Sequence, residues 1–235
     1  MELRVREAAK LFSVPEKKIY QWIQDNGLPA RQVSGQYRLN RAELLEWATA
    51  RQIPLSSEIF ADQQNGGVLP SFAAALEVGG IFHEVVASNR ESALRAVIKN
   101  MPLPDEADRE FLFEVLLARE AIGSTGIGNG IAVPHVRNPI VLRVTHPIVN
   151  LCFLSTPIDF GAIDGKPVFA LFGLVSPTVR MHLHVLSRLA FMLQETGFKN
   201  AVAQMAPTPE ILKEARRVEA AIERSSDSTS PKEQQ

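Results

Sequence analysis

Residues 123 to 135 read Gly-Ser-Thr-Gly-Ile-Gly-Asn-Gly-Ile-Ala-Val-Pro-His, a glycine-rich loop that runs through a short apolar segment into a histidine. Four of the first eight residues are glycine. Glycine lets the backbone take conformations that side chains forbid, so amide N–H groups can come close to an anion. The neutral imidazole of His135 can attack phosphorus and form a phosphoramidate. This combination predicts phosphate chemistry.

Phosphoryl transfer depends on positioning and on stabilising the equatorial oxygens, so cations and N–H donors are expected near the histidine. Arg119, just before the loop, can grip phosphate through two N–H groups. His182 is a further donor if it is protonated. The residues expected to form the phosphate loop are Ser124, Thr125, Gly126, Gly128 and Gly130. The hydroxyls of the first two are expected to bond loop backbone rather than to accept phosphate.

Other uses of a glycine-rich loop fit this sequence poorly. No lysine follows the glycines, as a P-loop requires, and a dinucleotide fold would need Gly-x-Gly-x-x-Gly opening a helix directly after a strand. Zinc would need His182 and His184 together with His135, but residues two apart on a helix point about 200° apart. We therefore expect no cofactor and no metal site.

The elements that must position these residues follow from hydrophobic periodicity. The segments typical of strands are 131–133, 148–154 and 168–175. Residues 181–195 have the spacing of an amphipathic helix. Asn89 and Asp108 can cap two further helices, and the second is expected to end at Arg119, before the loop. Together these elements predict an α/β sandwich with a mixed sheet.

Composition limits the class of protein. The chain has 235 residues, 46% hydrophobic and 22% charged, enough to bury one core and a small satellite unit. The longest apolar run, 168–175, is far shorter than the about 20 residues of a membrane helix, and the N-terminus has no signal-peptide core. Cys152, the single cysteine, is expected to be a core thiol. These features predict a cytoplasmic protein without membrane insertion.

Charge is distributed unevenly along the chain. Residues 1–51 hold nine Lys/Arg against six Asp/Glu, a balance of +3, and the remainder carries −4. This asymmetry predicts a small basic unit at 1–51, a linker at 52–67 that contains Pro, Ser and Gly, and a larger acidic unit at 68–224. Residues 225–235 contain no apolar side chain and are expected to be disordered.

The small basic unit has the pattern of two short helices, a hairpin and a third helix, which is typical of a winged helix-turn-helix. It resembles the excisionase and MerR-like DNA-binding family. The residues that carry the resemblance are Val5-Arg6-Glu7-Ala8-Ala9, Ile19-Tyr20-Gln21-Trp22-Ile23 and Gly35-Gln36-Tyr37-Arg38-Leu39.

That resemblance implies that the second helix enters the major groove of DNA. Lys17 and Lys18 would neutralise phosphates, Gln21 would read a base edge, and Arg38 in the wing would meet phosphate. A single module of this kind binds weakly, so a homodimer is expected if DNA is the target. The alternative is a solvated helix face on a protein-binding module.

From about residue 68 to 222 the chain resembles the enzyme IIA domains of the phosphoenolpyruvate-dependent sugar phosphotransferase system, of the fructose, mannitol and nitrogen-regulatory type. The residues that carry the resemblance are 116–120, 123–135, 163–168 and 182–187. It implies that His135 accepts phosphate from an HPr-type phosphocarrier protein and that Arg119 and His182 flank that phosphate. Many members have glycine after the histidine, where this chain has Val136-Arg137.

Three functions remain open on the sequence. The first is a regulator that binds DNA through residues 1–51 in response to phosphorylation of His135. The second is a plain phosphocarrier that relays phosphate to a separate IIB component for sugar uptake. The third is a regulator that binds a kinase or a transporter and makes no contact with DNA.

Overall fold

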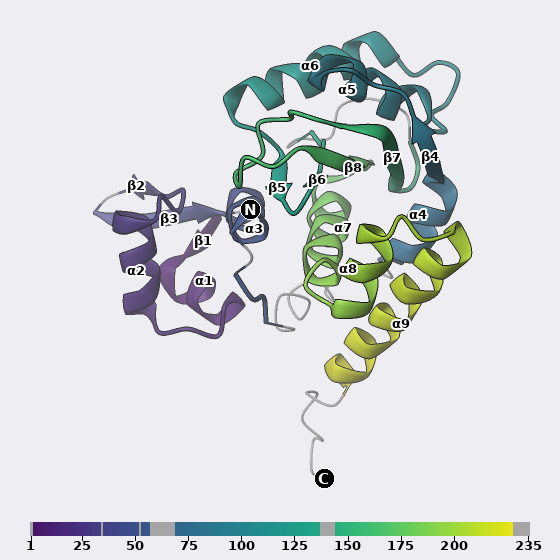
Figure 1. Ribbon diagram of the computed structural model, residues 1–235. Coiled ribbons are helices and arrows are strands. Elements are labelled where there is room, and N and C mark those ends of the chain that lie inside the picture. The colour runs from purple at the N-terminus through teal and green to yellow at the C-terminus, as the bar shows by residue number, and fades with distance from the viewer. Residues whose placement is uncertain (1, 34, 52, 57–68, 137–143, 228–235) are drawn as a thin grey trace.

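The computed structural model describes residues 2–33, 35–51, 53–56, 69–136 and 144–227 (Figure 1). Arg137 and most of the predicted linker lie outside these ranges, and so do the expectations for these residues. Within the described ranges, every helix is too short or too polar to cross a membrane.

The N-terminal unit combines three helices with a small antiparallel sheet of order β1-β3-β2. Its elements are β1 (Glu2–Arg4), α1 (Val5–Leu11), α2 (Glu16–Asp25), β2 (Arg31–Val33), β3 (Gln36–Asn40) and α3 (Arg41–Ala50). Strands β2 and β3 pair as the predicted hairpin, and Gly35 between them takes φ +78°. The predicted winged helix-turn-helix is confirmed.

Aromatic side chains hold this unit together. Phe12 meets the ring of Trp22 edge-on with centroids 5.2 Å apart, and Trp47 from α3 lies 5.3 Å from Trp22. The indole N–H of Trp47 donates to the carbonyl of Asn26 at 3.1 Å, so its polar group is satisfied inside the core. These contacts fix α3 against the helix-turn-helix pair.

The second unit is built around a five-stranded mixed sheet of order β4-β7-β8-β6-β5. Its elements are α4 (Phe72–Gly79), β4 (Ile81–Val85), α5 (Arg90–Lys99), α6 (Arg109–Ile122), β5 (Gly126–Gly128), β6 (Ile131–Ala132), β7 (Ile148–Ile158), β8 (Val168–Val175), α7 (Val179–Met192), α8 (Thr196–Ala203) and α9 (Thr208–Asp227). Strands β4 and β7 are parallel, β7 and β8 antiparallel, and β8 and β6 parallel. The predicted mixed α/β sandwich is confirmed.

Helices cover both faces of this sheet (Figure 1). The side chains of β7 and β8 alternate between the two faces. Cys152 and Leu171 face α5 and α6, whereas Phe153 and Phe172 face the layer of α4, α7, α8 and α9. Cys152 is fully buried, and burial raises the pKa of its thiol to about 12. The prediction of an unreactive core thiol therefore agrees with the structure.

The predicted helix caps are present, and two helices extend further than predicted. The side chain of Asn89 accepts from the amide of Ser92 at the start of α5, and Asp108 accepts from Phe111 at the start of α6. Helix α6 continues to Ile122, three residues beyond the expected end. Helix α9 continues to Asp227, so the first three residues of the predicted disordered tail are helical.

The two units are in contact through α3. This helix packs against α7 and β5, and one continuous apolar cluster includes Trp47 together with Leu186 and Leu189 of α7. In Figure 1, α3 lies between the second unit and the other elements of the first, while α2 lies on the far side. The helix expected to read DNA is therefore turned away from the second unit.

Candidate functional site

His135 follows the short strand β6 and is held beside β8. Its backbone forms a parallel bridge to Leu174, and Pro134 accepts from the amide of that residue at 3.1 Å. Only 2% of His135 is exposed. Ring nitrogen Nδ1 donates to the carbonyl oxygen of Val133 at 2.7 Å, since a carbonyl can only accept. This bond fixes the ring and leaves Nε2 as the nitrogen for chemistry.

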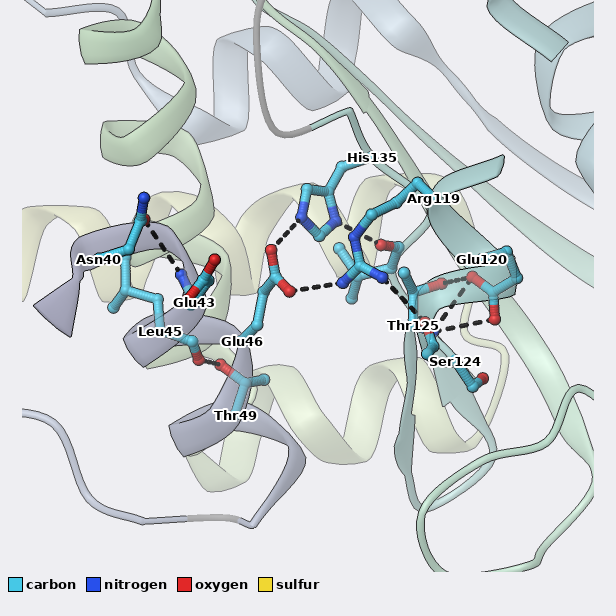
Figure 2. Close-up of polar contacts among 12 residues, drawn as sticks. Asn40, Glu43, Leu45, Glu46, Thr49, Arg119, Glu120, Ser124, Thr125 and His135 are labelled. Carbon is cyan, nitrogen blue, oxygen red and sulfur yellow. Dashed lines mark hydrogen bonds and ion pairs between the residues drawn. The ribbon is translucent and has the colours of Figure 1, made fainter. Parts of the chain in front are cut away.

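Arg119 brings a buried cation to the same place from the last turn of α6. Its Nη1 donates to the carbonyl of Gly123 at 2.8 Å, which anchors the guanidinium at the start of the glycine-rich loop. Its Nη2 points toward a carboxylate, described below, that lies beside the imidazole of His135 (Figure 2). Nε of Arg119 has no hydrogen-bond partner among the described residues. The structure thus brings together the predicted phosphoacceptor and its predicted cation.

The loop after α6 is held by a carboxylate for which the sequence predicted no role. Glu120 is buried and accepts from the amide of Thr125 at 2.9 Å and from its hydroxyl at 2.6 Å. Ser124 donates its hydroxyl to the carbonyl of Phe160 at 2.8 Å and accepts from the amide of Gly126. The Ser124 hydroxyl therefore bonds backbone, as expected, whereas the Thr125 hydroxyl bonds the carboxylate of Glu120 instead.

The glycines of the loop serve packing and turn geometry. Gly128 and Gly130 take φ +88° and +75° in the turn between β5 and β6. A Cβ on Gly130 would lie 2.4 Å from the ring of Phe169, and one on Gly126 would lie 2.7 Å from the backbone of Ala162. These three glycines do not line the cavity beside His135. In this structure they allow close packing in a tight hairpin, and the role expected for them around a phosphate stays a prediction.

His182 comes to the site from the first turn of α7. Its ring stacks on that of His135 with centroids 5.3 Å apart and planes 29° apart. Burial, and to a smaller extent the nearby His135, lower the pKa of His182 to about 3, although the charge of Glu46 acts in the opposite direction. His182 is therefore neutral near pH 7 and can offer one N–H, not the charged donor that the sequence left open. Its Nε2 has no hydrogen-bond partner within the described ranges.

The remaining histidines lie elsewhere, as expected. His184 points away from His182 and contacts the carbonyl of Pro70 through Nε2 at 3.1 Å. Burial, the largest cause, lowers the pKa of His184 to about 4. His83 lies against the ring of Phe153, and His146 contacts the hydroxyl of Thr145. The expectation that His182 and His184 cannot share one ion agrees with these directions.

The residue that the sequence missed is Glu46 in α3 of the N-terminal unit. One carboxylate oxygen, Oε1, lies 2.9 Å from Nε2 of His135, and Oε2 lies 2.5 Å from Nη2 of Arg119. Figure 2 shows the carboxylate between the two side chains. Only 15% of the Glu46 side chain is exposed. No local signal marks it, because it is one ordinary acidic residue on an amphipathic helix.

A cavity of about 320 Å³ lies between the two units at this contact. Its polar lining includes Arg119, Ser124, Thr125 and His135 from the second unit, and Glu46 belongs to the lining that the first unit supplies. Apolar side chains from α7, with Trp47 of α3 opposite, complete the wall. The space next to Nε2 is thus lined by residues of both units.

The residues predicted to contact DNA lie on two elements of the N-terminal unit. Lys17, Lys18 and Gln21 are exposed on α2, and Lys18 donates to the side chain of Gln21 at 3.2 Å. Arg38 is half-buried on β3. Its neighbours across the sheet are Arg4 on β1 and Arg31 on β2.

These three arginines form a row on one face of the small sheet, because residues directly opposite in a ladder share a face. The adjacent pair Leu3 and Leu39 is buried on the other face. The row is thus turned outward from the core. The sequence alone predicted a DNA contact only for Arg38. Arg4 and Arg31 join the row because of the strand register, which the sequence does not reveal.

Comparison with known proteins defines the class of protein to which this site belongs. Residues 75–216 match the family "Phosphoenolpyruvate-dependent sugar phosphotransferase system, EIIA 2", and residues 2–52 match a helix-turn-helix domain family. The chain belongs to this EIIA family and carries an N-terminal helix-turn-helix domain. Its second unit is a phosphotransfer domain.

The relatives of this chain include several nitrogen regulatory proteins. The chain is 40% identical over 124 residues to a nitrogen regulatory protein of Pseudomonas aeruginosa, covering 52% of this chain and 76% of that protein. It is 44% identical over 100 residues to the nitrogen regulatory protein of Escherichia coli K12, covering 41% of this chain and 57% of the relative. The crystal structure of nitrogen regulatory protein IIA-Ntr from Neisseria meningitidis superposes with a TM-score of 0.53 and 26% identity, over 61% of this chain and 97% of that one.

Proposed function

We propose that His135 accepts a phosphoryl group on Nε2 from an HPr-type phosphocarrier, and that the chain is a regulator that responds to this phosphorylation. One observation carries the proposal. The bond from Nδ1 to Val133 holds the imidazole in the tautomer that leaves Nε2 as the nucleophile, aimed at a cavity that also contains the guanidinium of Arg119. Both groups are nearly buried, so their interaction with a phosphoryl group is strengthened by exclusion of water.

The chemical step is a transfer between two imidazoles. The lone pair of Nε2 attacks phosphorus on the phosphohistidine of the carrier, and a new N–P bond forms as the carrier's N–P bond breaks. The electron pair of that bond returns to the carrier's ring nitrogen. Arg119 stabilises the equatorial oxygens, and neutral His182, stacked on His135, can donate one N–H to the phosphoryl group.

Phosphorylation of His135 is tested by incubating the full chain with phosphoenolpyruvate, enzyme I and an HPr-type carrier. Transfer is followed by intact mass and by acid-labile label, which is characteristic of phosphohistidine. We expect incorporation in the wild type and none in His135→Ala. His146→Ala is the matched control, because His146 is exposed and lies outside the site. Label retained by His135→Ala would exclude the proposed acceptor.

We further propose that the N-terminal unit binds DNA, which makes the chain a regulator rather than a simple relay. The support is the outward row of Arg4, Arg38 and Arg31 together with the exposed lysines of α2. Binding of the full chain to a mixed-sequence duplex is measured by fluorescence anisotropy at several salt concentrations. Binding that weakens with salt is expected. If no DNA is bound at low salt and phosphate passes efficiently to a separate IIB component, the relay function holds instead.

A further inference from the structure

The N-terminal unit places a carboxylate in the phosphoryl site of the second unit. Glu46 is 89 residues before His135 in the sequence, and its two oxygens contact Nε2 of His135 and Nη2 of Arg119 (Figure 2). All three side chains are at most 15% exposed. A carboxylate held between an imidazole and a guanidinium has the charge sign and the partners of a bound phosphoryl group.

Glu46 and a phosphoryl group cannot be accommodated together. A covalent N–P bond is shorter than the 2.9 Å between Nε2 and Oε1, so the phosphorus atom would lie in the space of the Glu46 carboxylate. A phosphoryl group brings a charge of about −1.5 to −2, which repels a carboxylate in a site with little water. Nη2 of Arg119 can bind either the Glu46 carboxylate or a phosphoryl oxygen at this position, but not both.

The contact also disables the nucleophile. Nδ1 of His135 already donates to Val133, and Nε2 faces a carboxylate oxygen. A proton must lie between Nε2 and that oxygen for the contact to be a hydrogen bond, whichever of the two atoms carries it. The lone pair of Nε2 is engaged in either case. Transfer therefore requires that the proton and the carboxylate leave first.

A second contact beside the site joins the two units. The side-chain amide of Gln194, just after α7, donates to the carbonyl of Ile53 at 3.1 Å and accepts from the amide of Leu55 at 3.2 Å. The amide of Ser56 in turn donates to the carbonyl of Leu11 in α1. A cavity of about 320 Å³ lies beside Glu46 in this interface, so packing is incomplete around the site, although the apolar contact of α3 with α7 continues beyond it. Repulsion between Glu46 and a phosphoryl group would act at this incompletely packed part of the interface.

We propose that Glu46 is a built-in competitor of the phosphoryl group: it closes the unphosphorylated site, and phosphorylation of His135 releases the helix-turn-helix unit from the EIIA unit. This inference rests on the proposed phosphorylation of His135. During transfer, the proton between Nε2 and Glu46 leaves with the carboxylate or to solvent, and the freed lone pair then takes the phosphoryl group from the carrier. Because α2 is already turned outward in the closed form, release changes how freely α2 moves relative to the EIIA unit rather than uncovering it.

The test compares Glu46→Ala with Glu114→Ala in the full chain. Glu114 is exposed on α6 and does not line this cavity, and its replacement removes the same charge. A closed form populated at about 90% lowers the observed rate of phosphorylation about tenfold. We expect Glu46→Ala to be phosphorylated about tenfold faster than the wild type, and Glu114→Ala to match the wild type. Circular dichroism verifies that both variants are folded.

Separation of the units gives an independent readout. The radius of gyration from small-angle X-ray scattering is expected to increase on phosphorylation of the wild type, and to be as large in unphosphorylated Glu46→Ala. Equal phosphorylation rates for wild type and Glu46→Ala, with no change in radius on phosphorylation, would overturn this inference while leaving His135 as the acceptor. No transfer to either protein would overturn the proposed function, and the inference with it.

Discussion

Replacing Arg119 by lysine keeps the positive charge but removes the forked guanidinium. Arg119 uses two nitrogens for two partners, with Nη1 on the carbonyl of Gly123 at 2.8 Å and Nη2 on Glu46 at 2.5 Å. During phosphoryl transfer, the second nitrogen becomes available to the phosphoryl oxygens. A lysine ammonium cannot reach both positions from one stem, because it is a compact point charge.

The expected magnitude follows from the loss of one charge-assisted hydrogen bond, about 1.5–3 kcal/mol. Since about 1.4 kcal/mol corresponds to a factor of ten in rate, Arg119→Lys should slow phosphorylation of His135 roughly tenfold to a hundredfold. The comparison is made in a Glu46→Ala background. In the wild type, Arg119→Lys would also weaken the contact with Glu46, which could speed phosphorylation and hide the slower transfer. The Glu46→Ala background lacks this contact, so only the effect on transfer is measured.

Single-turnover transfer from the phosphorylated carrier, stopped at set times and separated on phosphate-affinity gels, measures the rate. Arg109→Lys is the matched control at the other end of α6. Arg109 donates to the carbonyls of Ile98 and Met101, at 2.8 and 3.2 Å, so its replacement should lower the melting temperature and leave the transfer rate unchanged. A folded Arg119→Lys protein that accepts phosphate within about twofold of its parent would refute the assignment of Arg119, since a lost charge-assisted bond is worth far more.

Three further outcomes are expected. Burial holds the pKa of His182 near 3 in the folded chain, below its ordinary 6.5. The unfolded chain therefore binds a proton that the folded chain does not, and stability falls as the pH drops from about 6.5 toward 3, by up to about 1.4 kcal/mol per unit. In urea unfolding, His182→Gln should show a shallower fall, and parallel curves would contradict this. Gly130→Ala should lower the melting temperature, because φ is +75° and the new methyl meets the ring of Phe169; an unchanged value would show that the hairpin relaxes freely. Arg38→Ala should reduce the slope of log binding constant against log salt concentration by about 0.9, because one phosphate contact is lost. Lys213→Ala is the control and should leave this slope unchanged. If Arg38→Ala and the wild type have equal slopes, Arg38 does not contact DNA.

The parts of this protein that follow local rules were predictable from its sequence. Asn89 and Asp108 cap helices because their short side chains accept from amides three residues ahead, and this needs no distant partner. The apolar runs of β7 and β8 predict strands buried on both faces. The proximity of His135 and Arg119 could also be predicted, because both residues belong to one segment that runs from α6 through the loop to β6.

Other features depend on segments that are distant in the sequence. The roles of Gly126 and Gly130 are set by Ala162 and Phe169, which lie more than thirty residues further along the chain and fill the space where a Cβ would be. The neutral state of His182 is likewise set by burial, so its position in the sequence alone could not reveal it. The sequence predicted that these glycines lie around a phosphate, and only the tertiary structure shows which side chains pack against them.

The sequence by itself determined two folded units, their secondary structure and a histidine suited to carry phosphate. Only the tertiary structure placed Glu46 against that histidine. The physical reason is that a carboxylate on a helix surface has no local preference for a partner 89 residues away. The partner is selected by the packing of α3 on α7 and by the contacts of Gln194 with Ile53 and Leu55. These are properties of two folded surfaces, which exist only after each unit has formed.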